Sequence, residues 1–303
     1  MAKKVTIVIV NYNGARDTLA CLSSLRAIDY PAYEIIVVDN ASDDVQELVA
    51  TMLKDFPGIK IVALPQNRGF SGGCNVGIEY ALVRQSDYVL LLNNDTTVAP
   101  DFLTKLVEAA ESDPHIGIAG AKIYFRNEPD RIWYASGEFS WRNGGIHPGS
   151  GRIDTAKDDA RIIRTSFVTG CTFLIKTEVI RRIKMMPEQY FMYYEDIDWS
   201  LSAQKAGYGT VVAHASHVWH AVSASARHLG EPLLLYYHTR NALLLARRHA
   251  SLPVRFAIFL WSWYFYAKQR VKMVFLPSTR PLAIMIVRGI ADFYNGKFGK
   301  FKE

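Results

Sequence analysis

The sequence has few cysteines and no apolar run long enough to cross a membrane. Its three cysteines, Cys21, Cys74 and Cys171, lie far apart without a CxxC pair, so they indicate neither a disulfide framework nor a zinc site. We therefore expect a reducing, cytoplasmic location. The apolar and aromatic run at 256–267 has 12 residues, whereas a membrane-spanning helix needs about 20.

The sequence also lacks a signal-peptide cleavage site, an internal repeat and a low-complexity linker. The apolar run in the opening segment, MAKKVTIVIVNYNG, passes directly into polar residues, so we expect a strand there and not a signal peptide. The chain has 303 residues, of which 50% are hydrophobic. It can therefore bury one sizeable core with a smaller appendage, or form two domains.

Charge is divided unevenly along the chain. Residues 1–226 carry 22 Lys and Arg against 26 Asp and Glu, a net charge of −4, whereas residues 227–303 carry 13 against 3, a net charge of +10. The basic residues of the second part are interleaved with the aromatic run at 256–267 and with PLAIMIV at 281–287. This pattern favours peripheral attachment to the cytoplasmic membrane surface over nucleic-acid binding. Packing on the rest of the protein, or a homo-oligomer interface, is the alternative.

Apolar segments that end in polar turns alternate with helix-compatible stretches in the first hundred residues. The apolar segments predict strands, and they lie at 5–14, 33–42, 59–70 and 87–93. The resulting β-α-β-α-β-α-β order predicts an α/β fold with a mostly parallel central sheet and right-handed connections. We expect a catalytic domain at 1–226, with a nucleotide-binding half at 1–100, followed by a helical C-terminal region at 227–303.

The second half of the expected catalytic domain, 101–226, is expected to hold the acceptor and the catalytic residues, and its pattern is less regular. Residues 126–163 are rich in Gly, Asp, Arg and aromatic residues, which predicts a long excursion that forms a hairpin or a mobile lid. We expect this excursion to border the acceptor side of a site. Its tryptophans, Trp133 and Trp141, either contact an acceptor or only pack locally.

Polar side chains follow two of the predicted strands. Asn93, Asn94 and Asp95 come after VLLL, and Asp39 ends the strand at 33–42. Ligands of open α/β sheets bind at the carboxyl ends of the strands, so these groups are expected to converge on one rim of the sheet. Carboxylates at such positions also serve as helix N-caps, which is the competing interpretation.

A second acidic cluster lies in the segment YYEDIDW. Glu195, Asp196 and Asp198 stand among aromatic residues, a setting that raises the pKa of a carboxylate and supplies a general base. Acids at a helix start also stabilise the helix dipole, which is the alternative. The histidines of HASHVWH, at 214–220, follow the acids, and a carboxylate with a histidine suits Mn²⁺ or Zn²⁺ better than Mg²⁺.

The glycines of NRGFSGGCNVG, at 67–77, do not match the GxGxxG dinucleotide fingerprint. We expect these glycines to let backbone amides at a helix start approach a diphosphate.

Seven motifs in order resemble family 2 inverting glycosyltransferases of the GT-A fold, and rhamnosyltransferase-like bacterial members in particular. They are VIVNYNG, VVDNAS, NRGFSGGCNVGIEYA, LLNNDT, FVTGCTFLI, YFMYYEDIDW and HAVSAS. The likeness covers residues 5 to about 250. It implies a GT-A nucleotide-sugar-binding fold, a dTDP- or UDP-linked sugar donor, and a glycan or lipid-linked acceptor.

The resemblance also implies roles for single residues on the side of the sugar donor. Tyr12 would stack on the nucleotide base, Asp39 would hydrogen-bond a pyrimidine imide, and Asn93 would lie near the ribose. The remaining residues expected to bind the sugar donor are Arg68, Gly69 and Asn94.

On the metal and acceptor side, the NND triplet stands where the family has its DxD motif. Asp95 would therefore bind Mn²⁺ or Mg²⁺, with His220 as a further ligand. Asp196, the Asp of the ED motif, would be the catalytic base. The candidates for contact with the acceptor are Glu195, Asp198 and Trp199.

The sequence departs from the family pattern at three places. Many relatives have an Arg where Ser202 stands, and a Gly-x-Phe-Asp-Glu where this chain has MMPEQYF. No QxxRW follows the acidic motif, as it would in a processive synthase, so one sugar is expected per encounter.

The expected reaction is metal-dependent transfer of one sugar, with inversion, from a nucleoside diphosphate to an acceptor hydroxyl in cell-surface polysaccharide synthesis. Rhamnose from dTDP-rhamnose is the favoured donor. A sugar nucleotidyltransferase and a non-catalytic, membrane-associated sugar-binding protein are the alternatives. The first would be expected to carry a Gly-rich basic loop after the first strand, where NYNGARDT has one Gly and a distant Arg16.

Overall fold

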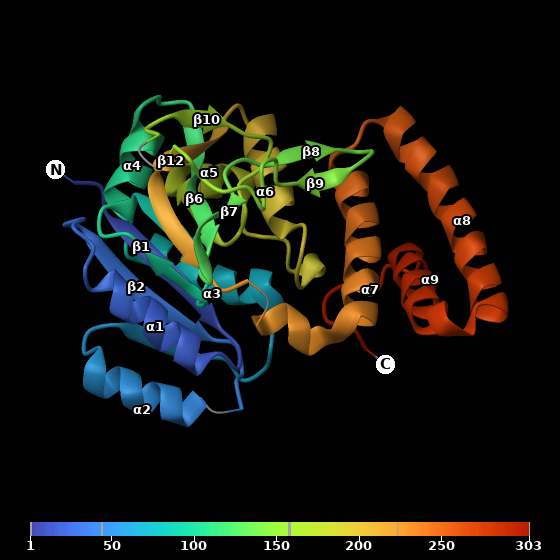
Figure 1. The fold of residues 1–303 in the computed structure, drawn as a ribbon, viewed down its shortest axis with the longest axis horizontal. Coiled ribbons are helices and arrows are strands. Elements are labelled where there is room, and N and C mark those ends of the chain that lie inside the picture. The colour runs from blue at the N-terminus through green and yellow to red at the C-terminus, as the bar shows by residue number, and fades with distance from the viewer. Residues whose placement is uncertain (1, 44, 157–158, 223, 303) are drawn as a thin grey trace.

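The computed structural model describes residues 2–43, 45–156, 159–222 and 224–302. Within these residues a ten-stranded sheet, flanked by helices, is followed by a group of C-terminal helices (Figure 1). Ser223 of the HAVSAS motif lies outside the described residues.

The first half of the sheet is parallel, as the sequence predicts. Its strands lie in the order β3-β2-β1-β4. They are β1 (Val5–Asn11), β2 (Tyr33–Asp39), β3 (Lys60–Ala63) and β4 (Tyr88–Leu92). Each is shorter than its predicted segment, because the polar residues at its carboxyl end leave the ladder and form the loops of one rim.

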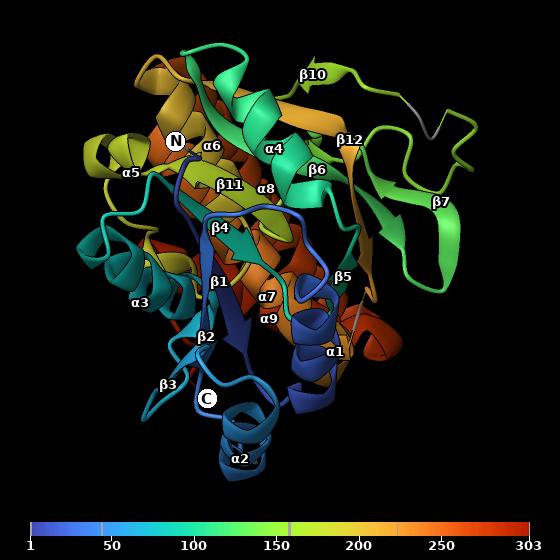
Figure 2. The same cartoon turned by 90° about the vertical axis from the view of Figure 1, so that its left-hand side faces the viewer.

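Helices cover both faces of these strands (Figure 2). The helices of this half are α1 (Ala15–Leu25), α2 (Val45–Asp55) and α3 (Gly69–Val83). Alternate residues of β1 enter two separate cores, since successive strand side chains point to opposite faces. Ile7 packs with Leu22 of α1, whereas Val8 packs with Ile78 of α3.

The second half of the sheet is mixed. Strand β11 is antiparallel to both β4 and β6, and β12 is parallel to β6. The carboxyl ends of β4, β6 and β12 therefore point to the same rim. The elements are β5 (Thr96–Val98), α4 (Phe102–Glu111), β6 (Ile116–Phe125), β11 (Thr172–Lys176), α5 (Thr177–Ile183), η1 (Glu188–Tyr190), α6 (Glu195–Lys205) and β12 (Gly209–His220).

The predicted excursion contains the expected hairpin. Strands β8 (Glu138–Ser140) and β9 (Gly144–Ile146) pair with each other, while β7 (Glu128–Tyr134) pairs with β6 and β10 (Ile162–Arg164) pairs with β12.

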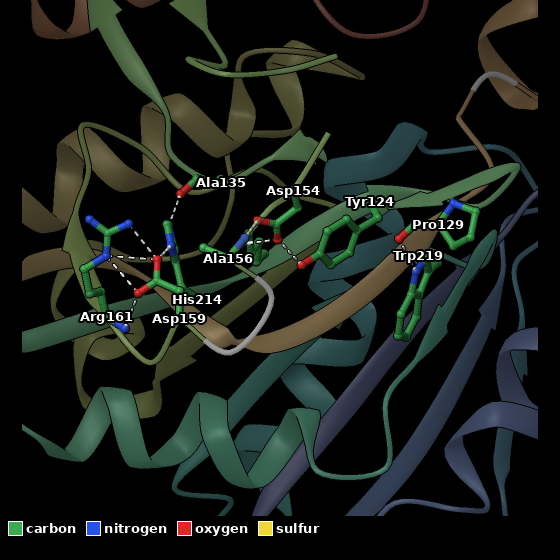
Figure 3. Close-up of polar contacts among 10 residues, drawn as sticks. Tyr124, Pro129, Ala135, Asp154, Ala156, Asp159, Arg161, His214 and Trp219 are labelled. Carbon is green, nitrogen blue, oxygen red and sulfur yellow. Dashed lines mark hydrogen bonds and ion pairs between the residues drawn. The ribbon is translucent and has the colours of Figure 1, made fainter. Parts of the chain in front are cut away.

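Two aspartates fasten the excursion to the sheet (Figure 3). Asp154 accepts a hydrogen bond from Tyr124 Oη at 2.6 Å and forms a buried ion pair with Lys122. Asp159 Oδ2 lies 2.9 Å from His214 Nδ1. The excursion is thus attached at its far end by charged side chains, and not only by its own strands.

The C-terminal region is helical, as expected. It consists of α7 (Ala224–His249), α8 (Leu252–Phe275), the short η2 (Pro277–Thr279) and α9 (Arg280–Tyr294). Figure 1 shows α7 beside the sheet and its flanking helices and α8 at the far end of the molecule, with α9 between them. No helix within the described ranges is both long enough and apolar enough to span a bilayer.

Candidate active site

The polar side chains that end β1 and β2 bind each other beneath the rim. Asp39 is fully buried. Its Oδ2 accepts hydrogen bonds from Asn11 Nδ2 and Ser42 Oγ, both at 2.7 Å, and its Oδ1 accepts one from the Ser42 amide at 2.9 Å. These bonds join the loop after β1 to the loop after β2. Tyr12, on the first of these loops, is 47% exposed, so its ring is free to stack on a ligand.

A tight turn at 67–69 begins α3. Asn40 holds this turn, because its Nδ2 donates to the Gly69 carbonyl at 2.9 Å and its Oδ1 accepts from the Arg68 amide at 2.9 Å. Gly69 has φ +74°, and a Cβ there would lie 2.2 Å from the carbonyl oxygen of Phe191. Only glycine fits this position. The Arg68 guanidinium forms an ion pair with Glu188 at 2.6 Å.

The two amides of the NND triplet point in different directions. Asn94 Nδ2 faces the loop after β1, with the Gly14 carbonyl at 3.3 Å and Thr18 Oγ1 at 3.1 Å. Asn93 Nδ2 lies 3.5 Å from His220 Nε2. The triplet therefore links the loops on the β1 side to the end of β12.

Asp95 and His220 meet across the sheet, 125 positions apart in the sequence. Asp95 Oδ1 lies 3.0 Å from His220 Nε2, and both side chains are nearly buried. Neighbouring ligand atoms around an octahedral ion with bonds of about 2.1 Å are about 3 Å apart. The pair has the spacing of two ligands of one divalent cation.

The rest of a metal coordination sphere would come from outside the protein. Within the described ranges no group of three or more His, Cys, Asp or Glu side chains is arranged to hold an ion. Divalent cations at phosphate-transfer sites often have one or two protein ligands and complete their coordination with substrate phosphates and water. Asp95 and His220 fit that kind of site.

His220 is enclosed by aromatic and polar neighbours. Burial alone would lower its pKa, but Cys171 and Asp95 beside it raise the pKa of His220 to about 10. The ring of Trp133, from the excursion, packs edge-on to His220 with ring centres 4.7 Å apart. The excursion thus reaches the site through Trp133, whereas Trp141 packs locally against Phe139 at 4.9 Å.

Asp196 lies at the start of α6, half-buried. Its Oδ2 accepts a hydrogen bond from the Gly170 amide at 3.0 Å, and its Oδ1 accepts one from the Ile197 amide at 2.8 Å. Burial raises the pKa of Asp196, although these amide bonds oppose the shift. Burial and the nearby Asp196 also raise the pKa of Glu195 well above its ordinary value.

The loop before β11 connects Asp196 to the NND triplet. The Gly170 amide binds Asp196, and the carbonyl of the next residue, Cys171, accepts a hydrogen bond from the Asn93 amide at 2.9 Å. The expected base and the expected metal site therefore lie on two sides of one short loop.

The three candidates for acceptor contact differ in their surroundings. Asp198 is fully buried and is contacted by Tyr190 Oη at 2.8 Å and by His249 Nε2 at 3.0 Å. Trp199 is also buried and donates to the Lys184 carbonyl at 3.2 Å. Both pack α6 into the protein, and neither reaches the surface. Glu195 is buried too, and its Oε2 has no hydrogen-bond partner among the described residues.

Sequence reasoning missed the polar residues that support the site from behind. Asn11 and Asn40 fix the loops after β1 and β2, and Arg240 and Asn241 of α7 bind the loop before Asp196. A signal for the last two was present. An arginine and an amide within the apolar stretch LLLYYHTRNALLLA indicate a buried polar pair, which must find partners elsewhere in the fold.

The sheet order, with the carboxylate of Asp95 in the turn after β4 opposite His220 at the end of β12, defines a GT-A nucleotide-sugar-binding fold. Residues 6–184 match the family model described as Glycosyl transferase family 2. This is more than half of the chain, and the chain belongs to that family of glycosyltransferases. The fold and the family expected from the sequence are both confirmed.

Relatives that span most of the chain carry rhamnosyltransferase names. The dTDP-rhamnosyl transferase RfbF of Shigella flexneri is 23% identical over 303 residues, covering 96% of this chain and 97% of its own length. The N-acetylglucosaminyl-diphospho-decaprenol L-rhamnosyltransferase of Mycobacterium tuberculosis is 24% identical over 271 residues, covering 83% and 87%. The succinoglycan biosynthesis protein ExoO of Rhizobium meliloti is 33% identical over 123 residues. That match covers 41% of this chain and only 32% of ExoO.

Two solved structures share the fold. GalNAc-T7 with UDP, GalNAc and Mn²⁺ superposes with a TM-score of 0.67 at 17% identity, covering 97% of this chain and 56% of that chain. The mannosyltransferase PcManGT from Pyrobaculum calidifontis, in complex with GDP-Man and Mn²⁺, gives a TM-score of 0.58 at 16% identity, covering 98% and 88%.

Proposed function

We propose that this glycosyltransferase transfers one sugar, with inversion, from a nucleoside diphosphate to an acceptor hydroxyl. The observation that carries the proposal is the pairing of two half-sites through one loop. Asp95 and His220 lie 3.0 Å apart on one side of Gly170–Cys171. On the other side, Asp196 accepts a hydrogen bond from the Gly170 amide. A base beside a metal–diphosphate site is what an in-line attack on the anomeric carbon requires.

Asp95 and His220 would hold Mn²⁺ or Mg²⁺. Bound there, the cation would act as a Lewis acid that stabilises the charge of the departing diphosphate. The Mn²⁺ in the GalNAc-T7 and PcManGT structures supports a divalent ion, since those proteins share this fold. The exposed Tyr12 would stack on the nucleotide base, and amides of the first turn of α3 would face the phosphates.

Asp196 would accept the proton of the acceptor hydroxyl as its oxygen attacks. The two amide hydrogen bonds to Asp196 leave a lone pair on each carboxylate oxygen. They also favour the charged form, which opposes the effect of burial. Help from a positioned general base is worth typically about 10² to 10⁴-fold in rate.

The sugar is proposed to be rhamnose from dTDP-rhamnose. The names of RfbF and of the mycobacterial relative support this choice, because both describe rhamnose transfer. The acceptor is proposed to be a glycan or lipid-linked sugar of cell-surface polysaccharide synthesis, since the mycobacterial relative is named for a decaprenol-linked acceptor. UDP-linked hexoses and UDP-galactofuranose are the alternative sugar donors.

Attachment to the cytoplasmic face of the cell membrane is part of the proposal, and α8 supports it. Two uncharged polar residues of this helix point inward: Ser262, whose Oγ lies 2.6 Å from Tyr294 Oη, and Gln269, which is buried. Its outward stripe is apolar. The stripe consists of Phe256, Leu260, Trp263, Ala267, Val271 and Val274, all exposed.

Cationic side chains line this outward stripe of α8. Arg255, Lys268 and Arg270 are exposed on the same helix. An apolar stripe with basic flanks is complementary to anionic lipid headgroups around an acyl boundary. A membrane-bound enzyme would meet a lipid-linked acceptor on the same surface.

The test is incubation of the purified chain with dTDP-rhamnose, UDP-glucose and UDP-galactose in the presence of Mn²⁺, with measurement of released nucleoside diphosphate. We expect dTDP release from dTDP-rhamnose and its loss in Asp196→Asn. Absence of release from every sugar donor would contradict the reaction class. Normal turnover by Asp196→Asn would remove Asp196 from its role and leave the reaction class standing.

Membership in the family leaves little room for the two alternatives. The nucleotidyltransferase reading lacks its basic loop after β1, where the loop at 12–14 is instead joined to Ser42 and Asp43 through Asn13. A non-catalytic sugar-binding protein would not need the Asp95–His220 pair or the amide-bound Asp196.

A further inference from the structure

The loop that leads into Asp196 has an unusual backbone. Phe191, Tyr193 and Tyr194 have φ values of 66°, 67° and 76°, in the left-handed region that favours glycine. Three such residues within four positions store strain. Backbone of this kind persists only where the surrounding structure holds it firmly, and it is often found at functional sites.

Two buried residues of α7 hold this loop. Asn241 Nδ2 donates to the carbonyl oxygens of Tyr190, Met192 and Tyr193 at 3.0, 2.7 and 3.1 Å. Arg240 Nη2 donates to the Tyr190 carbonyl at 2.9 Å. Arg240 and Asn241 are 1% and 0% exposed. Their hydrogen bonds satisfy the carbonyls that the strained backbone turns away from any strand or helix.

The same helix also binds the far side of the ED motif. Arg248 and His249, at the end of α7, contact the buried carboxylate of Asp198. Asp198 lies two residues after Asp196. Helix α7 therefore binds the chain on both sides of the proposed base, from contacts about two helical turns apart.

The outer side of the loop touches the part of the site that faces the sugar donor. The Phe191 carbonyl accepts a hydrogen bond from the Phe70 amide at 2.7 Å, in the first turn of α3. The position of the loop is thus shared between the start of α3 and α7. A shift of this loop would move Asp196 relative to the sugar donor.

We propose that Arg240 and Asn241 are positioning residues for sugar transfer, which hold the 190–194 loop so that Asp196 faces the acceptor hydroxyl. This rests on the proposed role of Asp196 as the base. The C-terminal region then has a part in the reaction itself, beyond any attachment. Simple packing does not explain the pair, because apolar side chains would fill the same volume without the cost of burying a charge.

The experiment compares Asn241→Leu and Arg240→Lys with the unchanged protein. Asn241→Leu keeps most of the side-chain volume and removes the amide donor. Arg240→Lys keeps the positive charge but loses the planar set of N–H donors of the guanidinium. We expect kcat to fall on the order of 10–100-fold, because small misplacements of a reacting group cost about that much. Binding of dTDP with Mn²⁺, measured by calorimetry, should change little.

A matched control lies on the same helix. Arg247 is exposed and stacks on Phe298 of the C-terminal segment, with its guanidinium carbon 4.9 Å from the ring centre. Among the described residues, Arg247 forms no hydrogen bond or ion pair with the 190–194 loop, and its contacts are with the rings of Phe293 and Phe298. Arg247→Lys should keep kcat near the unchanged value.

A double-mutant cycle separates positioning from general destabilisation. In an Asp196→Asn background, Asn241→Leu and Arg240→Lys should have little further effect on kcat, because the group they position is gone. A loss of the same size in both backgrounds would overturn the proposal. Normal turnover by Asp196→Asn alone would instead refute the base assignment, which is a different result.

Folding is checked by thermal melting of each variant. If Asn241→Leu does not fold, the double-mutant cycle is measured with Arg240→Lys, which keeps the charge, and Asn241→Gln, which keeps the amide. Unchanged kcat in both of these variants would also overturn the proposal.

Discussion

Asp95 and His220 form a pair that suits a metal bound together with its substrate. One or two protein ligands make a weak site, which is completed only when the diphosphate arrives. Such a site contributes to the reaction and not to folding. Removal of the ion with EDTA should therefore abolish transfer and leave the thermal midpoint nearly unchanged.

Asp95→Ala should reproduce the effect of EDTA. The expected result is loss of turnover that added Mn²⁺ does not restore, measured as release of dTDP. Asp55→Ala, an exposed carboxylate at the end of α2, is the matched control and should keep full activity. Full activity in EDTA would mean that the site works without a divalent ion.

Asp196 determines the expected pH dependence of the reaction. A base must be ionised to accept a proton, and burial raises the pKa of Asp196 above its ordinary value of 3.8. The rate should therefore rise with pH through an apparent pKa above 3.8, and the nearby Glu195 carboxyl shares in this titration. A profile of kcat against pH measures it. An acid limb at or below pH 3.8 would indicate a different base.

The strand ends were predictable from the sequence, but the state of their side chains was not. Apolar runs locate β1, β2 and β4, and the polar residues after them mark the rim. Whether Asp39 faces solvent or Asn11 depends on Ser42, which comes from a loop with no pattern of its own, and on Thr18 of α1, which donates a hydrogen bond to Asn11. Arg240 and Asn241 bind carbonyls about 50 residues away. Every residue has a backbone carbonyl, so the sequence does not indicate which carbonyls accept these bonds.

At the scale of elements, the 126–163 excursion depends on a buried ion pair. Burial alone would raise the pKa of Asp154, but Lys122 and Tyr124 lower it from 3.8 to about 2. Because the folded-state pKa is depressed, Asp154 contributes stability above about pH 4 that is lost as the pH falls toward 2. The shift corresponds to roughly 2 kcal/mol.

Asp154→Asn should therefore destabilise the protein at neutral pH, by about 3 kcal/mol because Lys122 is left buried without its partner. Urea denaturation from pH 7 to pH 3 measures this change. The difference from the unchanged protein should be constant down to pH 5 and should shrink below about pH 4. Glu138→Gln, an exposed carboxylate of the β8–β9 hairpin, serves as the control. A difference that grows in acid would contradict the assignment.

Elements could be predicted from the local sequence pattern where that pattern was clear. The hairpin in the excursion follows the expectation. The antiparallel insertion of β11 between β4 and β6 does not, since an apolar strand reads the same in either direction.

For the whole molecule, the separation of charge follows the arrangement in space. The basic C-terminal helices form one end of the protein (Figure 1). The exposed apolar stripe of α8 belongs to this end. Each Lys or Arg near an anionic headgroup adds about 1 kcal/mol. The full chain should co-sediment with anionic vesicles at low salt and less at high salt.

The double variant Leu260→Ser with Trp263→Ser should lose this binding. Leu53→Ser is the control, because Leu53 is 68% exposed on α2, outside the C-terminal helices. Equal binding to neutral and anionic vesicles would contradict an electrostatic contribution. If the double variant instead turns an oligomer into a monomer and leaves vesicle binding unaltered, the stripe is a contact between copies of the chain.

Gly289 bears on how such enzymes can be recombined. A Cβ at this position of α9 would lie 2.8 Å from the Tyr236 carbonyl and 3.4 Å from the Arg240 backbone nitrogen, so α9 and α7 touch backbone to backbone beside the arginine that holds the catalytic loop. The C-terminal helices therefore cannot be exchanged between relatives independently of the rest of the chain. A chimera that takes its C-terminal helices from a relative, joined at residue 226, would replace the α7 residues that bind the 190–194 loop. A chimera that keeps its native α7 would still need an α9 with glycine where the two helices cross.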